Sequence, residues 1–299
     1  MRLLDFIFAA RPMLLLPVWS IYLVTHHFLN LDGKIGAKAF VTLSAISLLM
    51  AGSYLINQIY DFQSDVINNK IGFLQRGYLE KREIAAAYFS TTVVGTAISA
   101  FLGLTFMIIA LLIVLLGFFY SSPPLRLKDR PLWGLLANGI GYGVLLPLSA
   151  ASYRKLEFSL LGLLILYFSL TVSAIYLITA IIDREGDQRT GKHTLSTKYS
   201  ERGLVIIGLT LVAGSLIVFA RMNLWPLGVM SVATFTLFLV LMIAQSQRLL
   251  LFSSKFPILL LTLLAGYYYP VYLVFVLVLI IACRLYYKKR FGMIYPKLS

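Results

Sequence analysis

The sequence predicts an all-α protein, a single polytopic bundle of about nine transmembrane helices that fills residues 1–299. Of these 299 residues, 60% are hydrophobic and only 13% are charged, whereas about a quarter of a soluble domain is charged. The hydrophobic residues also fall in runs of about twenty, the length of a helix that crosses a bilayer. We therefore expect one multi-pass transmembrane domain in a cell membrane rather than one or two soluble domains.

Nine apolar runs, separated by short polar segments, define the expected spans. In chain order they are Met13–Leu29, Ala37–Tyr60, Ile84–Leu102, Leu104–Tyr120, Leu132–Ser152, Leu156–Ile182, Gly203–Ala220, Leu224–Ala244 and Phe256–Arg284. Only Gly103 separates the third run from the fourth, so these two should form a tight hairpin. The last run contains Gly266 and Pro270. We expect a kink there, because neither half is long enough to span alone.

Lysine and arginine are unevenly distributed between the two sides of the expected bundle. With the N-terminus inside, the inner segments hold sixteen of them and the outer loops five, which places the loops after spans two and six in the cytoplasm. Nine spans leave the five basic residues of the C-terminal tail outside, against this trend. The net charge of +14 is thus explained by membrane orientation. We expect no nucleic-acid partner and no obligate protein partner.

Two acidic motifs lie where the second and sixth spans end. They comprise Asn57, Asp61 and Asp65 in the first motif and Asp183 and Asp187 in the second. Four-residue spacing places such side chains on one face of a helix. Acids at the membrane are costly unless they are paired or metal-bound, so they indicate function. Mg²⁺ binds through one or two carboxylates together with substrate phosphate oxygens. We therefore predict that all five residues hold Mg²⁺ and that the four aspartates are catalytic.

The inner loops also carry basic residues that suit a diphosphate. The candidates are Lys70, Arg76, Arg126, Lys128, Arg189 and Lys192. Arginine binds phosphate through a planar fork, and lysine binds it as a point charge. We expect two or three of the six to contact the diphosphate.

These motifs resemble those of the UbiA-type intramembrane prenyltransferase superfamily. That family carries Asn-Asp-x-x-Asp-x-x-x-Asp after its second span and Asp-x-x-x-Asp after its sixth. Residues 120–128, which read Tyr-Ser-Ser-Pro-Pro-Leu-Arg-Leu-Lys, are similar to the family's Tyr…Lys segment, and Arg11-Pro12 is similar to its opening Arg-Pro. The chain departs from the pattern at Gln58, where the family usually has Asp, and at Gly72-Phe73, where it often has Arg-Pro.

The resemblance implies Mg²⁺-dependent transfer of a prenyl group from a polyprenyl diphosphate to a hydrophobic, aromatic or lipid acceptor within the membrane, through ionisation of the allylic diphosphate. It also implies that Arg11 and Tyr120 bind the acceptor. Three acceptors stay open: a quinone precursor, a glycerol-phosphate lipid and a tetrapyrrole. The Tyr120 segment favours the tetrapyrrole branch, whereas the second motif favours the quinone or archaeal-lipid branches.

An apolar bundle would supply the dry cavity that an allylic cation requires. Its aromatic candidates are Tyr60, Tyr142, Tyr167 and Tyr176, because aromatic faces stabilise a nearby cation. The glycines of the fifth span, Gly134, Gly139, Gly141 and Gly143, should allow close helix packing. The alternative is a cation-coupled transporter or lipid-binding protein that binds a cation with the same aspartates. Transporters usually have helices broken at mid-membrane, whereas these acids lie at span ends.

Overall fold

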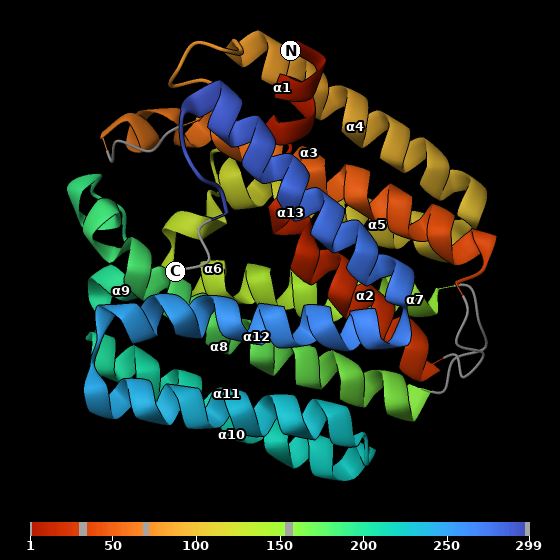
Figure 1. Ribbon diagram of the computed structural model, residues 1–299, viewed down its shortest axis with the longest axis vertical. Coiled ribbons are helices and arrows are strands. Elements are labelled where there is room, and N and C mark those ends of the chain that lie inside the picture. The colour runs from red at the N-terminus through yellow and green to blue at the C-terminus, as the bar shows by residue number, and fades with distance from the viewer. Residues whose placement is uncertain (1, 30–34, 68–71, 153–157, 297–299) are drawn as a thin grey trace.

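Long helices running side by side make up most of the molecule (Figure 1). The structure is a computed structural model that describes residues 2–29, 35–67, 72–152 and 158–296. Its helices are α1 (Arg2–Ala9), η1 (Pro12–Leu15), α2 (Leu16–Leu29), α3 (Ala37–Ile67), α4 (Lys81–Leu102), α5 (Leu104–Ser121), η2 (Leu127–Asp129), α6 (Pro131–Asn138), η3 (Gly139–Leu145), α7 (Leu146–Ala151), α8 (Phe158–Arg189), α9 (Leu195–Lys198), α10 (Glu201–Met222), α11 (Trp225–Ala244), α12 (Gln247–Tyr268) and α13 (Pro270–Phe291). The predicted all-α membrane fold is confirmed.

Ten helical segments within the described residues are long and apolar enough to cross a membrane. The predicted count of nine was wrong because the expected last span, Phe256–Arg284, is two helices, α12 and α13, of 22 residues each. Pro270 is the first residue of α13, where its missing N–H removes no helical hydrogen bond. Each helix also gains length from polar ends, since lysine and arginine lay their apolar stems along a helix and keep their charge outside.

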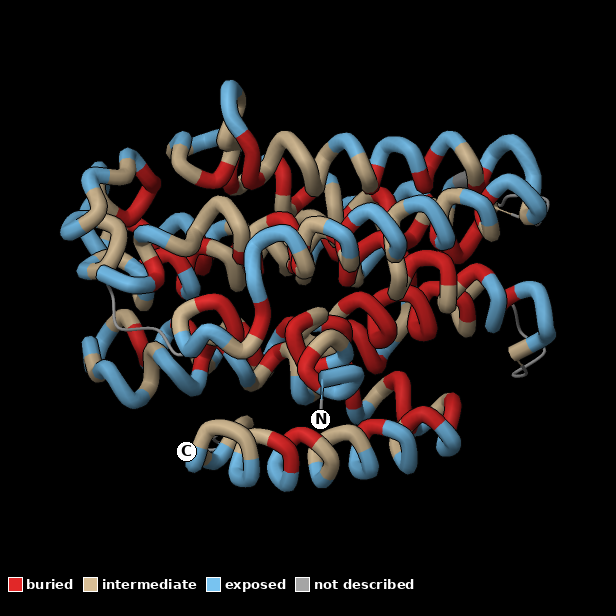
Figure 2. Tube along the Cα trace, turned by 90° about the horizontal axis from the view of Figure 1, so that it is seen from above, coloured by how far each residue is buried: buried red, intermediate tan, exposed pale blue. Residues whose placement is uncertain are grey.

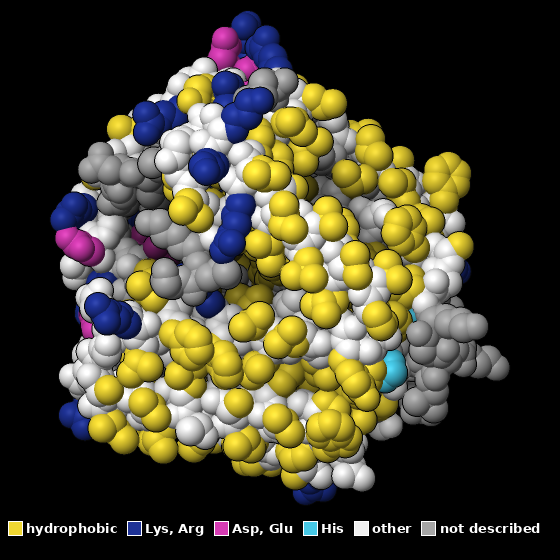
Figure 3. Space-filling model, in the orientation of Figure 1, with side chains coloured by type: hydrophobic (Ala, Val, Ile, Leu, Met, Phe, Trp, Pro, Cys, Tyr) yellow, Lys and Arg dark blue, Asp and Glu magenta, His cyan; other side chains and the backbone are white. Residues whose placement is uncertain are grey.

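An even number of spans returns the C-terminus to the end of the bundle that holds the N-terminus. Arg290, in the last turn of α13, forms an ion pair with Asp5 of α1 at 2.8 Å. The basic residues of α13 therefore lie on the N-terminal side, which agrees with the charge distribution of the other loops. Figure 3 shows Lys and Arg gathered along the upper and left edges of the molecule, while apolar side chains cover the face between them.

Each of the two motif helices packs between neighbouring helices. The helix α3 packs against α4 and α5, and α8 packs against α10 and η3. The last helix, α13, lies along one side of the bundle (Figure 2) and contacts α12 and η1. One glycine of the fifth span, Gly143, allows a close approach between helices. A Cβ on Gly143 would lie 2.4 Å from the Cα of Ser169 in α8.

Gly143→Ala should therefore destabilise the protein. The added methyl group meets backbone, which cannot move aside as a flexible side chain can, and such overpacking costs about 1–3 kcal/mol. The thermal unfolding midpoint in detergent tests this expectation. Gly162→Ala is the matched control, because Gly162 lies in α8 with open space around it. A midpoint unchanged by Gly143→Ala would contradict the close packing.

Candidate active site

The first acidic motif occupies the last turns of α3, as its spacing predicts. Asn57 Oδ1 accepts hydrogen bonds from Ser121 Oγ at 2.9 Å and from Lys128 Nζ at 2.7 Å. The same lysine donates to Asp61 Oδ1 at 2.6 Å. One turn further on, Asp65 is buried. The end of α5 and the short helix η2 thus supply the groups that surround this motif.

Gln58 does not join the other polar residues of the motif. Its Nε2 donates to the carbonyl oxygens of Ala9 at 2.7 Å and Tyr54 at 3.1 Å. The buried side chain therefore ties α3 to the end of α1. Gln58 has a packing role at the place where the resembling family usually has Asp.

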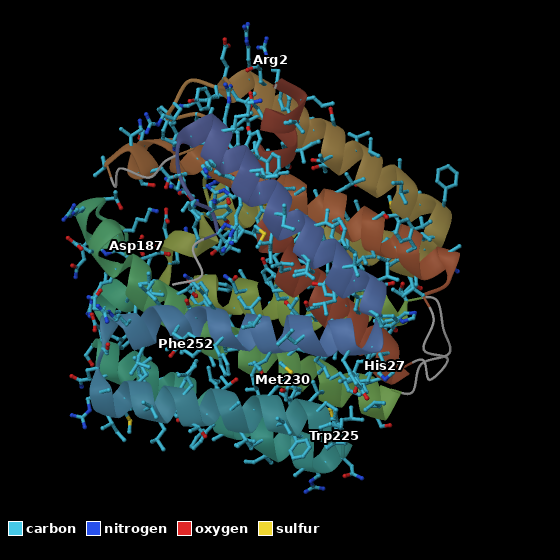
Figure 4. The ribbon with its side chains drawn as sticks, in the orientation of Figure 1. Arg2, His27, Asp187, Trp225, Met230 and Phe252 are labelled. Atoms are coloured by element: carbon cyan, nitrogen blue, oxygen red, sulfur yellow. The ribbon has the colours of Figure 1, made fainter. Side chains whose placement is uncertain are left out.

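The second acidic motif lies at the end of α8, opposite the end of the bundle that holds His27 and Trp225 (Figure 4). Gly191 follows with φ 68°, a left-handed conformation that suits glycine. Its N–H donates to Gln188 O and the N–H of Lys192 donates to Asp187 O, which is the hydrogen-bond pattern of a Schellman motif. This turn directs Lys192 back toward the motif.

Lys192 joins the two motifs. Its Nζ lies 3.6 Å from Asp61 Oδ1 and 3.8 Å from Asp187 Oδ1. Two helices that lie far apart in the sequence therefore place carboxylates around one ammonium group. No group of three His, Cys, Asp or Glu side chains in the described parts of the chain forms a ready metal cage.

Among the candidate phosphate ligands that the structure describes, Lys128 is the most buried, with 9% of its side chain exposed. Burial lowers the pKa of this lysine from its ordinary value, because the charged form loses hydration, and the carboxylate of Asp61 partly opposes that shift. The position of Lys128 depends on Arg126, which adopts a left-handed conformation with φ 39°. The chain reverses there and brings η2 against the first motif.

The other predicted phosphate ligands lie elsewhere or outside the described residues. Arg189 pairs with Glu185 on the exposed side of α8, and Arg126 pairs with Asp129 at 2.9 Å. Arg76 lies exposed in the turn after α3. Lys70 lies outside the described residues. Of the five candidates that the structure describes, it thus brings together Lys128 and Lys192.

A cavity of about 360 Å³ opens beside the acidic motifs. Asn57 and Asp183 line its polar end, and Met50, Ile113 and Leu145 line its apolar end. Both predicted acceptor ligands, Arg11 and Tyr120, also line it. The cavity therefore joins charged groups to an apolar slot.

Four tyrosines were predicted to line the cavity, and Tyr142 does so, together with Tyr54, which the sequence reasoning missed. Their hydroxyl groups lie 2.7 Å apart. Tyr167 instead packs in the core, where its hydroxyl donates to Leu227 O at 2.9 Å. Asn138 was also missed. Its Nδ2 donates to Tyr120 OH at 3.2 Å, and its position within an apolar run was the available signal.

A larger cavity of about 840 Å³ lies near the opposite ends of α2, α3 and α13. Apolar and aromatic side chains such as Trp19, Phe40 and Tyr268 line it, and none of the predicted site residues does. The smaller cavity is therefore the candidate active site, because it alone of the two meets both acidic motifs.

The guanidinium group of Arg11 makes no hydrogen bond or ion pair with any residue that the structure describes. Arg11 also has φ 54° and ψ 59°, a left-handed conformation that costs free energy in a residue other than glycine. An unpaired positive charge in a strained position at a cavity wall is typical of a ligand-binding residue.

The fold and the site together define an integral membrane enzyme that acts on a phosphorylated, largely apolar substrate. A model of the UbiA prenyltransferase family matches residues 14–255. Digeranylgeranylglyceryl phosphate synthase of Sulfolobus acidocaldarius is 29% identical over 216 residues, which are 68% of this chain and 74% of the relative. The chloroplastic 2-acyl-4-prenylphloroglucinol 6-prenyltransferase of Humulus lupulus is 30% identical over 167 residues, which are 51% of this chain and 40% of the relative.

A solved structure has the same fold. It is a UbiA homolog from Archaeoglobus fulgidus bound to GPP and Mg²⁺, with a TM-score of 0.69 and 19% identity, and the match covers 88% of this chain and 99% of that one. The chain belongs to the UbiA prenyltransferase family, and prenyl transfer is its reaction. The predicted resemblance is confirmed, and the transporter alternative is set aside.

Lys128→Gln should lower the rate of prenyl transfer by about 10²-fold, the usual effect of removing one donor aimed at developing negative charge. Arg130→Gln is the matched control, because Arg130 is exposed two residues further along the same loop. Initial rates at saturating substrate measure the effect. Equal rates for the two variants would show that Lys128 has no part in the reaction.

Proposed function

We propose that this enzyme transfers a prenyl group from a polyprenyl diphosphate to a glycerol-phosphate lipid, with Mg²⁺ as cofactor. The observation that carries the proposal is the position of Lys192 between Asp61 and Asp187, beside a cavity whose far end is apolar. An anionic head group and a long apolar chain are the two parts of a prenyl diphosphate.

The residues of the two motifs fit Mg²⁺. Their donors are carboxylate and amide oxygens, which suit a hard cation, and an ion held jointly with phosphate oxygens needs only one or two carboxylates. A lysine ammonium already lies between the motifs, so positive charge is accommodated there. We assign Asn57, Asp61 and Asp65 to one side of the metal site and Asp183 and Asp187 to the other. When bound, Mg²⁺ would neutralise the charge that gathers on the departing diphosphate.

The chain's own residues act on both reacting groups. As the allylic carbon–oxygen bond breaks, its electron pair leaves with the diphosphate, which Lys128 and Lys192 hold in place. An acceptor hydroxyl oxygen forms the new bond to carbon. Its proton leaves with the diphosphate, whose released oxygen accepts it. The apolar walls exclude water, which would otherwise capture the cation, and the ring of Tyr142 faces the same space.

Two observations support a glycerol-phosphate acceptor. Arg11 offers an unpaired guanidinium group at the cavity, and guanidinium binds phosphate through paired hydrogen bonds. The relative from Sulfolobus acidocaldarius is named for a glyceryl phosphate product.

We also propose that the motif loops face the cytoplasm and that residues 1–299 form one transmembrane domain. With ten spans, the basic residues in the last turn of α13 fall on the same side as the sixteen of the inner loops. This distribution supports the proposed orientation through the positive-inside rule. A single hydrophobic cluster contains Phe8, Phe73 and Tyr286, so the two ends of the chain share one core.

A reconstituted assay tests the reaction. The purified protein in detergent receives radiolabelled geranylgeranyl diphosphate, Mg²⁺ and, one at a time, geranylgeranylglyceryl phosphate, hydroxybenzoate, dihydroxynaphthoate and chlorophyllide. We expect product with the glycerol phosphate only, and loss of more than 10²-fold in rate for Asp61→Asn and Asp187→Asn, because each removes one metal-binding charge. Glu185→Gln is the exposed control. Product with another acceptor would overturn the acceptor assignment.

Arg11→Gln separates acceptor binding from diphosphate binding. We expect the KM for the acceptor to rise about tenfold or more, as loss of a charged hydrogen bond predicts, while the KM for geranylgeranyl diphosphate stays within about twofold. Steady-state kinetics with each substrate varied in turn gives both constants. A rise confined to the diphosphate KM would assign Arg11 to the other substrate.

A further inference from the structure

A buried ion pair joins the two ends of the chain outside the part that the family model matches. Asp5 of α1 is 1% exposed. Its Oδ2 accepts a hydrogen bond from Arg290 Nη2 at 2.8 Å, and its Oδ1 accepts one from the hydroxyl of Tyr286. We call Asp5, Tyr286 and Arg290 the terminal clasp. The family model covers residues 14–255, so all three lie beyond it.

The clasp also holds the turn that follows the first acidic motif. The guanidinium carbon of Arg290 lies 3.7 Å from the ring centroid of Tyr78. The hydroxyl of Tyr78 donates to the carbonyl oxygen of Arg290 at 3.0 Å, which satisfies one of the free carbonyls at the end of α13. Three segments that are distant in the sequence therefore meet at one arginine.

On the other side, the clasp fixes the backbone that carries Arg11. Phe8 stacks on Tyr286 with ring centroids 3.9 Å apart. The carbonyl of Phe8 accepts from the N–H of Arg11 at 3.1 Å, and the carbonyl of the next residue, Ala9, accepts from Gln58. A non-glycine residue in a left-handed conformation persists only where its surroundings hold it. Here those surroundings are the clasp and α3.

The segment after α13 returns toward Arg11 as well. The rings of Tyr287 and Tyr295 lie 4.7 Å apart. Burial raises the pKa of Tyr295, and the nearby charge of Arg11 partly opposes that rise. The elements anchored by the clasp thus surround the base of Arg11.

A buried ion pair is a weak source of stability, because the loss of hydration offsets most of the attraction. Apolar residues would pack as well in this aromatic cluster. What the pair adds is a fixed geometry between α1 and α13. We propose that Asp5 and Arg290 are positioning residues that hold Arg11 at the cavity for the acceptor. This inference rests on the proposed function, in which Arg11 binds the acceptor.

A double-mutant cycle tests the proposal, with geranylgeranylglyceryl phosphate as acceptor, or whichever acceptor gives product in the assay above. Asp5→Asn, Arg11→Gln and their combination are compared. We expect Asp5→Asn to raise the acceptor KM about fivefold to tenfold and to leave the diphosphate KM within about twofold. When Asp5→Asn is combined with Arg11→Gln, the acceptor KM should rise no further than with Arg11→Gln alone, because coupled residues act as one unit. Arg284→Gln, exposed on the same helix, is the control.

The KM values of these variants distinguish a positioning role of Asp5 from a structural one. If the effects of Asp5→Asn and Arg11→Gln on the acceptor KM multiply in the double variant, the two residues act independently. If Asp5→Asn raises both KM values equally, its role is only structural. Either result would overturn the proposal. If Arg11→Gln leaves the acceptor KM unchanged, Arg11 does not bind the acceptor. That part of the proposed function is then wrong, regardless of the effect of Asp5→Asn. If Asp5→Asn does not fold, Tyr286→Phe decides, because it removes one hydrogen bond and keeps the stacked ring. Tyr286→Phe should raise the acceptor KM about threefold, and an unchanged value would overturn the proposal.

Discussion

The structure depends on neutralising partly buried carboxylates at one end of an apolar bundle. Asp61 lies against Lys128 and Lys192, and Asp187 lies against Lys192. A carboxylate with low exposure and no partner would cost several kcal/mol or lose its charge, so the elements that carry these residues must end at the same level. The lengths of the motif helices agree with this need. With 31 and 32 residues, α3 and α8 exceed the roughly twenty that a bilayer requires.

Sequence spacing predicted the parts of the site that helical geometry dictates. Asn57 and Asp61 share a face because they are four residues apart. The choice among six basic residues was beyond the sequence, because it depends on loop conformation. Arg126 adopts a left-handed conformation that its residue type does not predict. Because the chain reverses there, Lys128 becomes the buried ligand. Arg189 has a local partner four residues away in Glu185 and stays outside.

The two departures from the resembling family have one structural explanation. Gln58 donates to the end of α1, and Phe73 packs against Phe291 with ring centroids 5.2 Å apart. Each unusual residue therefore contacts a terminal segment outside the family match. The sequence showed that these positions differ. It did not show why, because the reason lies in tertiary contacts, one across 49 positions and the other across more than two hundred. The predicted number of spans was also one too few. A proline at the start of a helix and a proline kink within a helix give the same hydropathy pattern.

Charge balance also links the resting site to the proposed reaction. Without substrate, Lys128 and Lys192 compensate Asp61 and Asp187. A diphosphate arriving with Mg²⁺ brings cations for the aspartates and anionic oxygens for the lysines, so each group exchanges one partner for another of the same sign. Such an exchange leaves no buried charge uncompensated at any stage, which a low-dielectric site demands. Arg11 is the exception, because its guanidinium has no partner among the described residues. A second anionic molecule, the acceptor, would complete the balance.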